Sequence, residues 1–128
     1  MTKIAIIEDD QAISQMYRIK FETEGYEVEI AENGKLGLEL VENFRPDIIL
    51  LDLMMPEMSG DEMLAKLRQT DFGRDVKVII LTNMGEQEAP DILKSLGVSV
   101  FIVKAHSTPT EVTDIVNEIL GKKTPGVV

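Results

Sequence analysis

The sequence of 128 residues predicts a single α/β domain, in which a doubly wound parallel sheet is covered by helices on both faces. Short apolar runs without internal charges, such as residues 48–51 and 78–81, are typical of strands buried on both faces. These runs alternate along the chain with segments whose apolar residues recur at helical spacing. Alternation of this kind indicates strand–helix–strand units and therefore a parallel sheet.

Two strand–helix units precede the most apolar run. Residues 3–8 are predicted to form the first strand, and the helix after them has a stop signal at Gly25. Residues 26–31 alternate glutamate with apolar side chains, which is typical of a half-exposed strand at the edge of a sheet. Asn33 opens the second helix, and Pro46 ends it because the residue before a proline avoids helical dihedral angles.

The third strand, residues 47–52, is the centre of the predicted sheet and ends at Asp52. Ser59 is expected to be the N-cap of the third helix, and Gly60 allows a tight turn at its entry. The fourth strand, residues 76–82, ends at Thr82.

The last third of the chain is expected to hold two more helices. Residues 86–96 predict a weaker fourth helix, which requires Pro90 in its first turn. Residues 98–103 predict the fifth strand, with Lys104 directly after it. Residues 108–111 read Thr-Pro-Thr-Glu, a capping box that starts the fifth helix. We expect residues 1–121 to form one domain and residues 122–128 a flexible tail.

Composition narrows the possible functions. The formal net charge of −10 argues against direct binding to nucleic acid, which requires a positive surface. The absence of cysteine excludes disulfides and thiolate metal sites. No apolar run approaches the length of a membrane span, and the first residues lack the layout of a signal peptide. We therefore expect a cytoplasmic protein with no membrane contact.

Five strands alternating with five helices, joined by right-handed crossovers, are best accommodated by the flavodoxin-like (βα)5 fold with strand order 2-1-3-4-5. In that order the carboxyl ends of strands 1, 3, 4 and 5 meet in one crevice. The residues at these ends are Glu8 and Asp9 for strand 1, Asp52 for strand 3, Thr82 for strand 4 and Lys104 for strand 5. Asp10 also follows the first strand, but we give it no ligand role.

The chemistry of these side chains suits phosphoryl transfer. Clustered carboxylates repel one another unless a cation or a proton is bound, and oxygen ligands favour Mg²⁺. A carboxylate nucleophile can accept a phosphoryl group as an aspartyl phosphate, with lysine and hydroxyl groups stabilising charge on the phosphoryl oxygens. Taken singly, Asp52 can equally be a cap for the next turn, Glu8 and Asp9 solvated loop residues, and Lys104 a surface charge.

Four segments carry a resemblance to a known family over residues 3–120. Residues 6–10 read Ile-Ile-Glu-Asp-Asp, and residues 50–60 read Leu-Leu-Asp-Leu-Met-Met-Pro-Glu-Met-Ser-Gly. Residues 81–82 read Leu-Thr, and residues 103–104 read Val-Lys. With these segments the chain resembles the receiver domain of two-component response regulators, in its single-domain, CheY-like form.

The resemblance implies a role for each site residue. It implies that Asp52 accepts a phosphoryl group from a histidine kinase or a histidine phosphotransfer protein. The chain would then be no enzyme in the usual sense and would catalyse only its own phosphorylation and dephosphorylation. Glu8, Asp9, Asp52 and the main-chain carbonyl of Met54 would bind Mg²⁺. Lys104 would contact the phosphoryl group. Thr82 and Phe101 would be the switch residues, acting on a downstream protein through the face made by the fourth helix, fifth strand and fifth helix.

Departures from the family and rival interpretations remain open at this point. Ala105 stands where the family usually has proline; since a cis bond before any other residue costs about 2.5–4 kcal/mol, we predict a trans Lys104–Ala105 bond. The chain can also be a pseudo-receiver that binds partners without phosphorylation, or a flavodoxin-like cofactor binder, although the loop after the first strand is acidic. A third alternative is a fragment of a larger regulator, with a linker beginning near Lys122.

Overall fold

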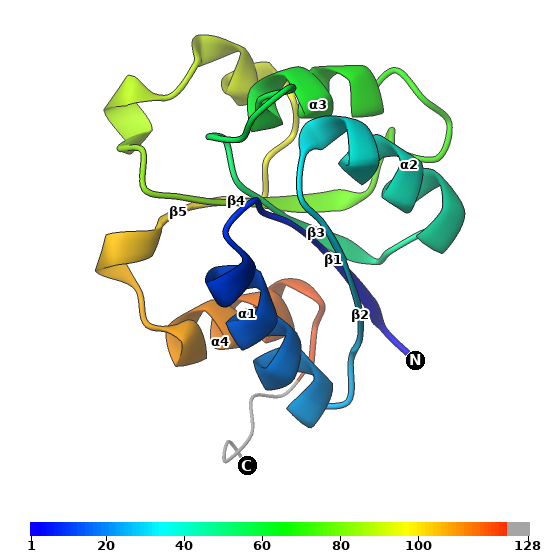
Figure 1. Ribbon diagram of the computed structural model, residues 1–128, viewed down its shortest axis with the longest axis vertical. Helices are drawn as coiled ribbons and strands as arrows, with labels where there is room; N and C mark the ends of the chain where they lie inside the picture. Colours follow the sequence, from blue (N-terminus) through cyan, green and yellow to red (C-terminus); the bar gives the residue numbers. More distant parts are fainter. Residues whose placement is uncertain (123–128) are drawn as a thin grey trace.

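The computed structural model describes residues 1–122 and contains a five-stranded parallel sheet (Figure 1). The strands are β1 (Lys3–Ile7), β2 (Glu27–Ala31), β3 (Ile48–Leu51), β4 (Lys77–Thr82) and β5 (Val100–Val103). Their order is β2-β1-β3-β4-β5, and every neighbouring pair is parallel. The predicted α/β class and flavodoxin-like strand order are therefore confirmed. Apart from Lys122, the predicted tail lies outside the described residues.

Within residues 1–122, four α-helices cover the two faces of the sheet (Figure 1). They are α1 (Gln11–Thr23), α2 (Gly34–Phe44), α3 (Gly60–Leu67) and α4 (Pro109–Ile119). Alternate strand residues separate two apolar cores. Ile4 and Ile6 pack with α1 and α4, whereas Ala5 and Ile7 pack with α2 and α3. Burial on both faces explains why β3 and most of β1 and β4 are continuous apolar runs, whereas β2 at the edge of the sheet carries exposed glutamates.

Local signals account for most helix boundaries. Asp10 accepts a hydrogen bond from the amide of Ile13 at the start of α1, and Asn33 accepts one from Leu36 at the start of α2. The capping box of α4 is present, with Pro109 in the first turn. Ser59 occupies the predicted N-cap of α3, but its side chain makes no capping hydrogen bond. None of the helices within residues 1–122 combines the length and apolar character needed to cross a bilayer.

The predicted fourth helix is wrong. Residues 83–99 contain two short 3-10 turns instead, η1 (Glu86–Glu88) and η2 (Asp91–Ser95). Ala89 and Pro90 between them are extended, with ψ angles of 149° and 136°. Proline disfavours the helical region for the residue before it, and Gly97 at φ +70° ends the remaining stretch. Between these two breaks the chain forms only the 3-10 turn η2, so the predicted fifth helix is α4.

A third 3-10 turn, η3 (Lys104–His106), connects β5 to α4. No peptide bond within the described chain is cis. The Lys104–Ala105 bond is thus trans, as predicted.

Candidate functional site

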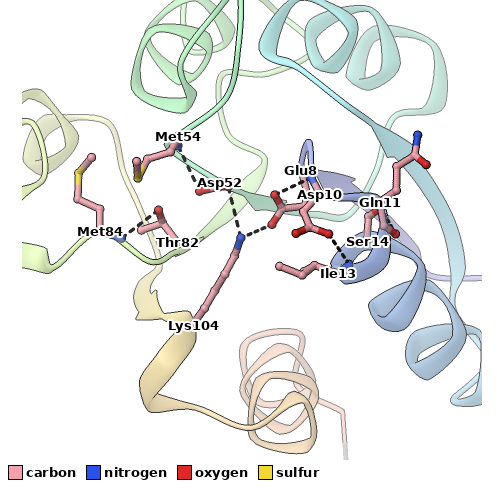
Figure 2. Close-up of polar contacts among 10 residues, drawn as sticks. All are labelled: Glu8, Asp10, Gln11, Ile13, Ser14, Asp52, Met54, Thr82, Met84 and Lys104. Carbon is pink, nitrogen blue, oxygen red and sulfur yellow. Dashed lines mark hydrogen bonds and ion pairs between the residues drawn. The ribbon is translucent and has the colours of Figure 1, made fainter.

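The carboxyl ends of four strands place the predicted site residues at one edge of the sheet. Ile7 lies beside Leu51 in the register, Leu51 beside Ile80, and Thr82 beside Val103. The residues that follow these positions therefore emerge together. Figure 2 shows Glu8, Asp52, Thr82 and Lys104 converging from β1, β3, β4 and the end of β5.

Three carboxylates form the acidic part of the site. Glu8, Asp9 and Asp52 each offer an oxygen, and these atoms lie within 4.8 Å of one another. Glu8 and Asp52 are buried, with 5% and 6% of their surface exposed, whereas Asp9 is exposed. An all-oxygen donor set that is open to solvent on one side suits a hard divalent cation that keeps some of its water.

Lys104 supplies the positive charge. Its Nζ atom donates a hydrogen bond to Glu8 Oε1 and lies 3.3 Å from Asp52 Oδ2. Only 12% of the lysine side chain is exposed. Because β5 ends at Val103 and η3 begins at Lys104, the strand sets the position of the lysine and directs its side chain toward β1 and β3 (Figure 2).

Burial shifts the protonation of this cluster. Burial of Glu8 raises the pKa of its carboxyl group, the hydrogen bond from Lys104 opposes the rise, and the charge of Asp52 adds to it; the pKa is about 7. Burial alone would lower the pKa of Lys104, but its bond to Glu8 and the two carboxylate charges raise it. The site therefore holds more negative charge than one lysine neutralises, and binding of a proton or a cation relieves the excess.

Backbone contacts hold Asp52 in place. Its amide donates to the carbonyl of Ile7 at 3.0 Å, and Met54 N–H donates to Asp52 Oδ1 at 3.2 Å. Gly60 lies directly against this turn: a Cβ atom there would be 2.2 Å from the carbonyl oxygen of Asp52. The sequence assigns Gly60 only to a tight helix entry, because a close approach between residues eight positions apart leaves no local pattern.

Of the two switch candidates, Thr82 lies at the end of β4 and Phe101 lies within β5. Thr82 is fully buried, and its Oγ1 accepts a hydrogen bond from Met84 N–H at 3.3 Å. Phe101 on β5 lies beside Ile80 on β4 and packs, half-buried, against the core on the α2 and α3 side. The Met54 side chain is 58% exposed at the mouth of the site. Asp10, which follows the acidic pair in the sequence, caps α1.

A residue that the sequence places only in the core also lies beside this site. Tyr17 of α1 lines a small cavity of about 10 Å³ together with Glu8 and Asp52. Burial raises the pKa of its phenol, and the charge of Glu8 adds to the effect. The helical spacing that places Tyr17 in the core does not distinguish an aromatic residue beside a carboxylate from one among apolar side chains.

Comparison with known proteins gives one consistent family. The model of the response regulator receiver domain matches residues 4–117. The chain is 40% identical over 86 residues to the DNA-binding dual master transcriptional regulator RpaA of Synechocystis sp., covering 67% of this chain and 36% of that protein. It is 32% identical over 123 residues to the phosphate regulon transcriptional regulatory protein PhoB of Pseudomonas aeruginosa, covering 96% of this chain and 53% of that protein. It thus spans about half or less of the length of these relatives.

Solved structures are similar over nearly the whole chain. The chemotaxis protein CheY4 of Vibrio cholerae superimposes with a TM-score of 0.85 at 27% identity, covering 93% of this chain and 98% of that one. A CheY-like response regulator receiver domain protein from Methanospirillum hungatei superimposes with a TM-score of 0.86 at 30% identity, covering 94% of each chain.

Proposed function

The chain belongs to the response regulator receiver domain family of two-component systems, and on that premise we propose that Asp52 is its phosphoacceptor. Receiver domains are signalling domains and not classical enzymes. The observation that carries the proposal is the environment of Asp52: it is buried at the end of the central strand, within 4.8 Å of Glu8 and Asp9 and 3.3 Å from the Lys104 ammonium group.

The chemical step is a phosphoryl transfer between two proteins. A carboxylate oxygen of Asp52 forms a bond to phosphorus, while the bond between phosphorus and a histidine nitrogen of the donor breaks and leaves its electron pair on that nitrogen. The donor is a histidine kinase or a histidine phosphotransfer protein. Lys104 is placed to stabilise the negative charge on the phosphoryl oxygens, and Thr82 offers a hydroxyl donor from the next strand.

The donor set fits the Mg²⁺ ion on which receiver domains depend. Glu8, Asp9, Asp52 and the main-chain carbonyl of Met54 would hold it. A bound divalent cation supplies positive charge that neutralises the phosphoryl oxygens and the crowded carboxylates. The geometry supports this assignment, because three carboxylate oxygens lie within 4.8 Å of one another and one lysine cannot balance their charge.

Signal output follows from movement of Thr82 and Phe101. We expect Thr82 to move toward the phosphoryl group and Phe101 to turn into the space that opens. The affected face contains η1, η2, β5 and α4, and a downstream protein would bind there. The relatives named as transcriptional regulators are longer than this chain. For this chain we propose output through contact with a downstream protein, and a cytoplasmic location.

Intact mass after incubation with a small acyl phosphate and Mg²⁺ tests the proposal without knowledge of the kinase. The wild type should gain one phosphoryl group, and a chelator should suppress the gain. Asp52→Asn should abolish it. Asp47→Asn is the matched control, since Asp47 is an exposed carboxylate at the amino end of the same strand. An equal adduct on Asp52→Asn, or none on the wild type, would show that Asp52 is not an acceptor.

A further inference from the structure

The two edge strands of the sheet differ in charge. β2 carries Glu27 and Glu29 as exposed residues. β5 reads Val-Phe-Ile-Val, and Val100, Phe101 and Val103 are only half-buried. Charged side chains on an edge strand prevent pairing with another chain, and an uncharged apolar edge invites it. The β2 edge is thus protected, and the β5 edge is open to pairing.

A cavity of about 380 Å³ lies at the amino end of this open edge. Gly97 to Phe101 line it, so the cavity lies against the segment that enters β5 and against the first two residues of the strand. Ala89, Pro90 and Leu93 form its apolar wall. The wall consists of η1, η2 and the extended residues between them, in the place where an α-helix was predicted. A cavity of this size accommodates a large apolar side chain.

The rim of the cavity is acidic. Glu86 and Asp91 line it, and the exposed Glu88 lies in the same 3-10 turn as Glu86. The one basic residue in the lining, Lys94, has its ammonium group 3.7 Å from the carboxylate of Asp91. A second copy of this chain, with its net charge of −10, would set acidic residues against acidic residues here. Lysine or arginine side chains of a different protein would be attracted.

We propose that the β5 edge and its cavity bind an extended basic segment of a partner protein by strand addition. The segment pairs its backbone along Val100–Val103, places an apolar side chain in the cavity, and directs lysine or arginine side chains to Glu86 and Asp91. This deepens the proposed function and rests on it, because it gives the chemistry of the target that binds the output face.

The test uses a fluorescently labelled peptide of alternating lysine and valine. A second peptide has alternate valines replaced by proline, so it keeps the charge but lacks the amides needed for strand pairing. By fluorescence anisotropy the first peptide should bind at least about tenfold more tightly. Amide exchange in residues 100–103 should slow when it binds.

Charge-matched variants locate the binding site. Glu86→Gln with Asp91→Asn should weaken binding by about fivefold, the size expected for two exposed charge contacts. Glu27→Gln with Glu29→Gln removes the same charge from the opposite edge and should change affinity by less than about twofold. Equal losses in the two double variants would show non-specific attraction and overturn the proposal.

Other outcomes also contradict it. Equal binding of the proline peptide would exclude strand addition. A concentration-dependent dimer in sedimentation that Val100→Lys abolishes would show that a second copy occupies the edge. All binding is measured without a phosphodonor and repeated in Asp52→Asn. Failure of the peptide test therefore leaves the mass result for Asp52 standing, and failure of phosphorylation leaves the peptide result standing.

Discussion

When no divalent cation is present, loss of the proton from Glu8 should make the protein less stable as pH rises. In the folded protein its pKa lies at about 7, against an ordinary value of 4.5. A carboxyl group whose pKa is raised by folding binds its proton more tightly in the folded state. Its contribution to stability is therefore fully present below pH 4.5 and is lost as pH rises through about 7.

The size of the effect follows from the two pKa values. One pKa unit is worth about 1.4 kcal/mol, so the rise from 4.5 to about 7 corresponds to about 3 kcal/mol of unfolding free energy. This is a large fraction of the 5–15 kcal/mol, roughly, that stabilises an ordinary domain. Most of the loss should occur between about pH 5 and pH 8.

Urea unfolding across this pH range in a chelator measures the loss. Glu8→Gln removes the titrating group and should flatten the pH dependence by about 3 kcal/mol relative to the wild type. Glu111→Gln is the control: hydrogen bonds from Thr108 lower the pKa of Glu111, so this exposed residue titrates below the range tested. His106, the single histidine, is present in all three proteins and cancels.

Mg²⁺ provides the second arm of this experiment. A cation that binds only the folded protein, at a concentration one hundred times its dissociation constant, adds about 2.7 kcal/mol to the unfolding free energy. The gain should be largest at high pH, because protons compete with the cation for Glu8. Equal pH dependence in the wild type and Glu8→Gln would refute the reasoning, and it would mean that Glu8 is ionised throughout the range.

Three further changes have defined expectations. Asp9→Ala should leave stability in chelator unchanged or higher and abolish the Mg²⁺-dependent rise in melting temperature; an undiminished rise would rule Asp9 out as a ligand. Gly60→Ala should cost about 2–3 kcal/mol of unfolding free energy, because the added Cβ would collide with the backbone of Asp52. Gly85→Ala is the control and should cost little, because the nearest atom to its added Cβ would be 3.9 Å away. Equal melting temperatures of the two variants would contradict the close approach of Gly60 to Asp52. Arg68→Met should lower the unfolding free energy in urea by about 2 kcal/mol, because the guanidinium group donates hydrogen bonds to the carbonyls of Leu96, Gly73 and Val76. Arg74→Met is the control: it removes only an exposed ion pair with Asp71 and should cost less than about 1 kcal/mol.

The strands and their ends could be predicted because both follow from local sequence. Each buried strand is an uninterrupted apolar run, and the first polar residue after that run marks the end of the strand. Parallel pairing then requires the ends to meet, so Glu8, Asp52 and Lys104 come together although they are far apart in the chain. The prediction depended on the sheet geometry and needed no individual contact.

The prediction failed where two local signals conflict. Residues 92, 93 and 96 are apolar at helical spacing, and this spacing predicts a helix. Pro90 forces the residue before it out of the helical region, and here that constraint determines the backbone. Contacts between distant segments, such as Gly60 against Asp52 or Arg68 against Leu96, leave no signal in either segment alone.

The position of Lys104 shows what the sequence cannot supply about the site. The family resemblance implies that this lysine contacts a phosphoryl group at Asp52. In the structure its hydrogen bond to Glu8 joins it to a metal-ligand candidate as well as to the acceptor. A proton, the lysine and, under the proposed function, a cation would compete for Glu8. If a cation binds Glu8, we expect its hydrogen bond with Lys104 to weaken and the ammonium group to stay beside Asp52.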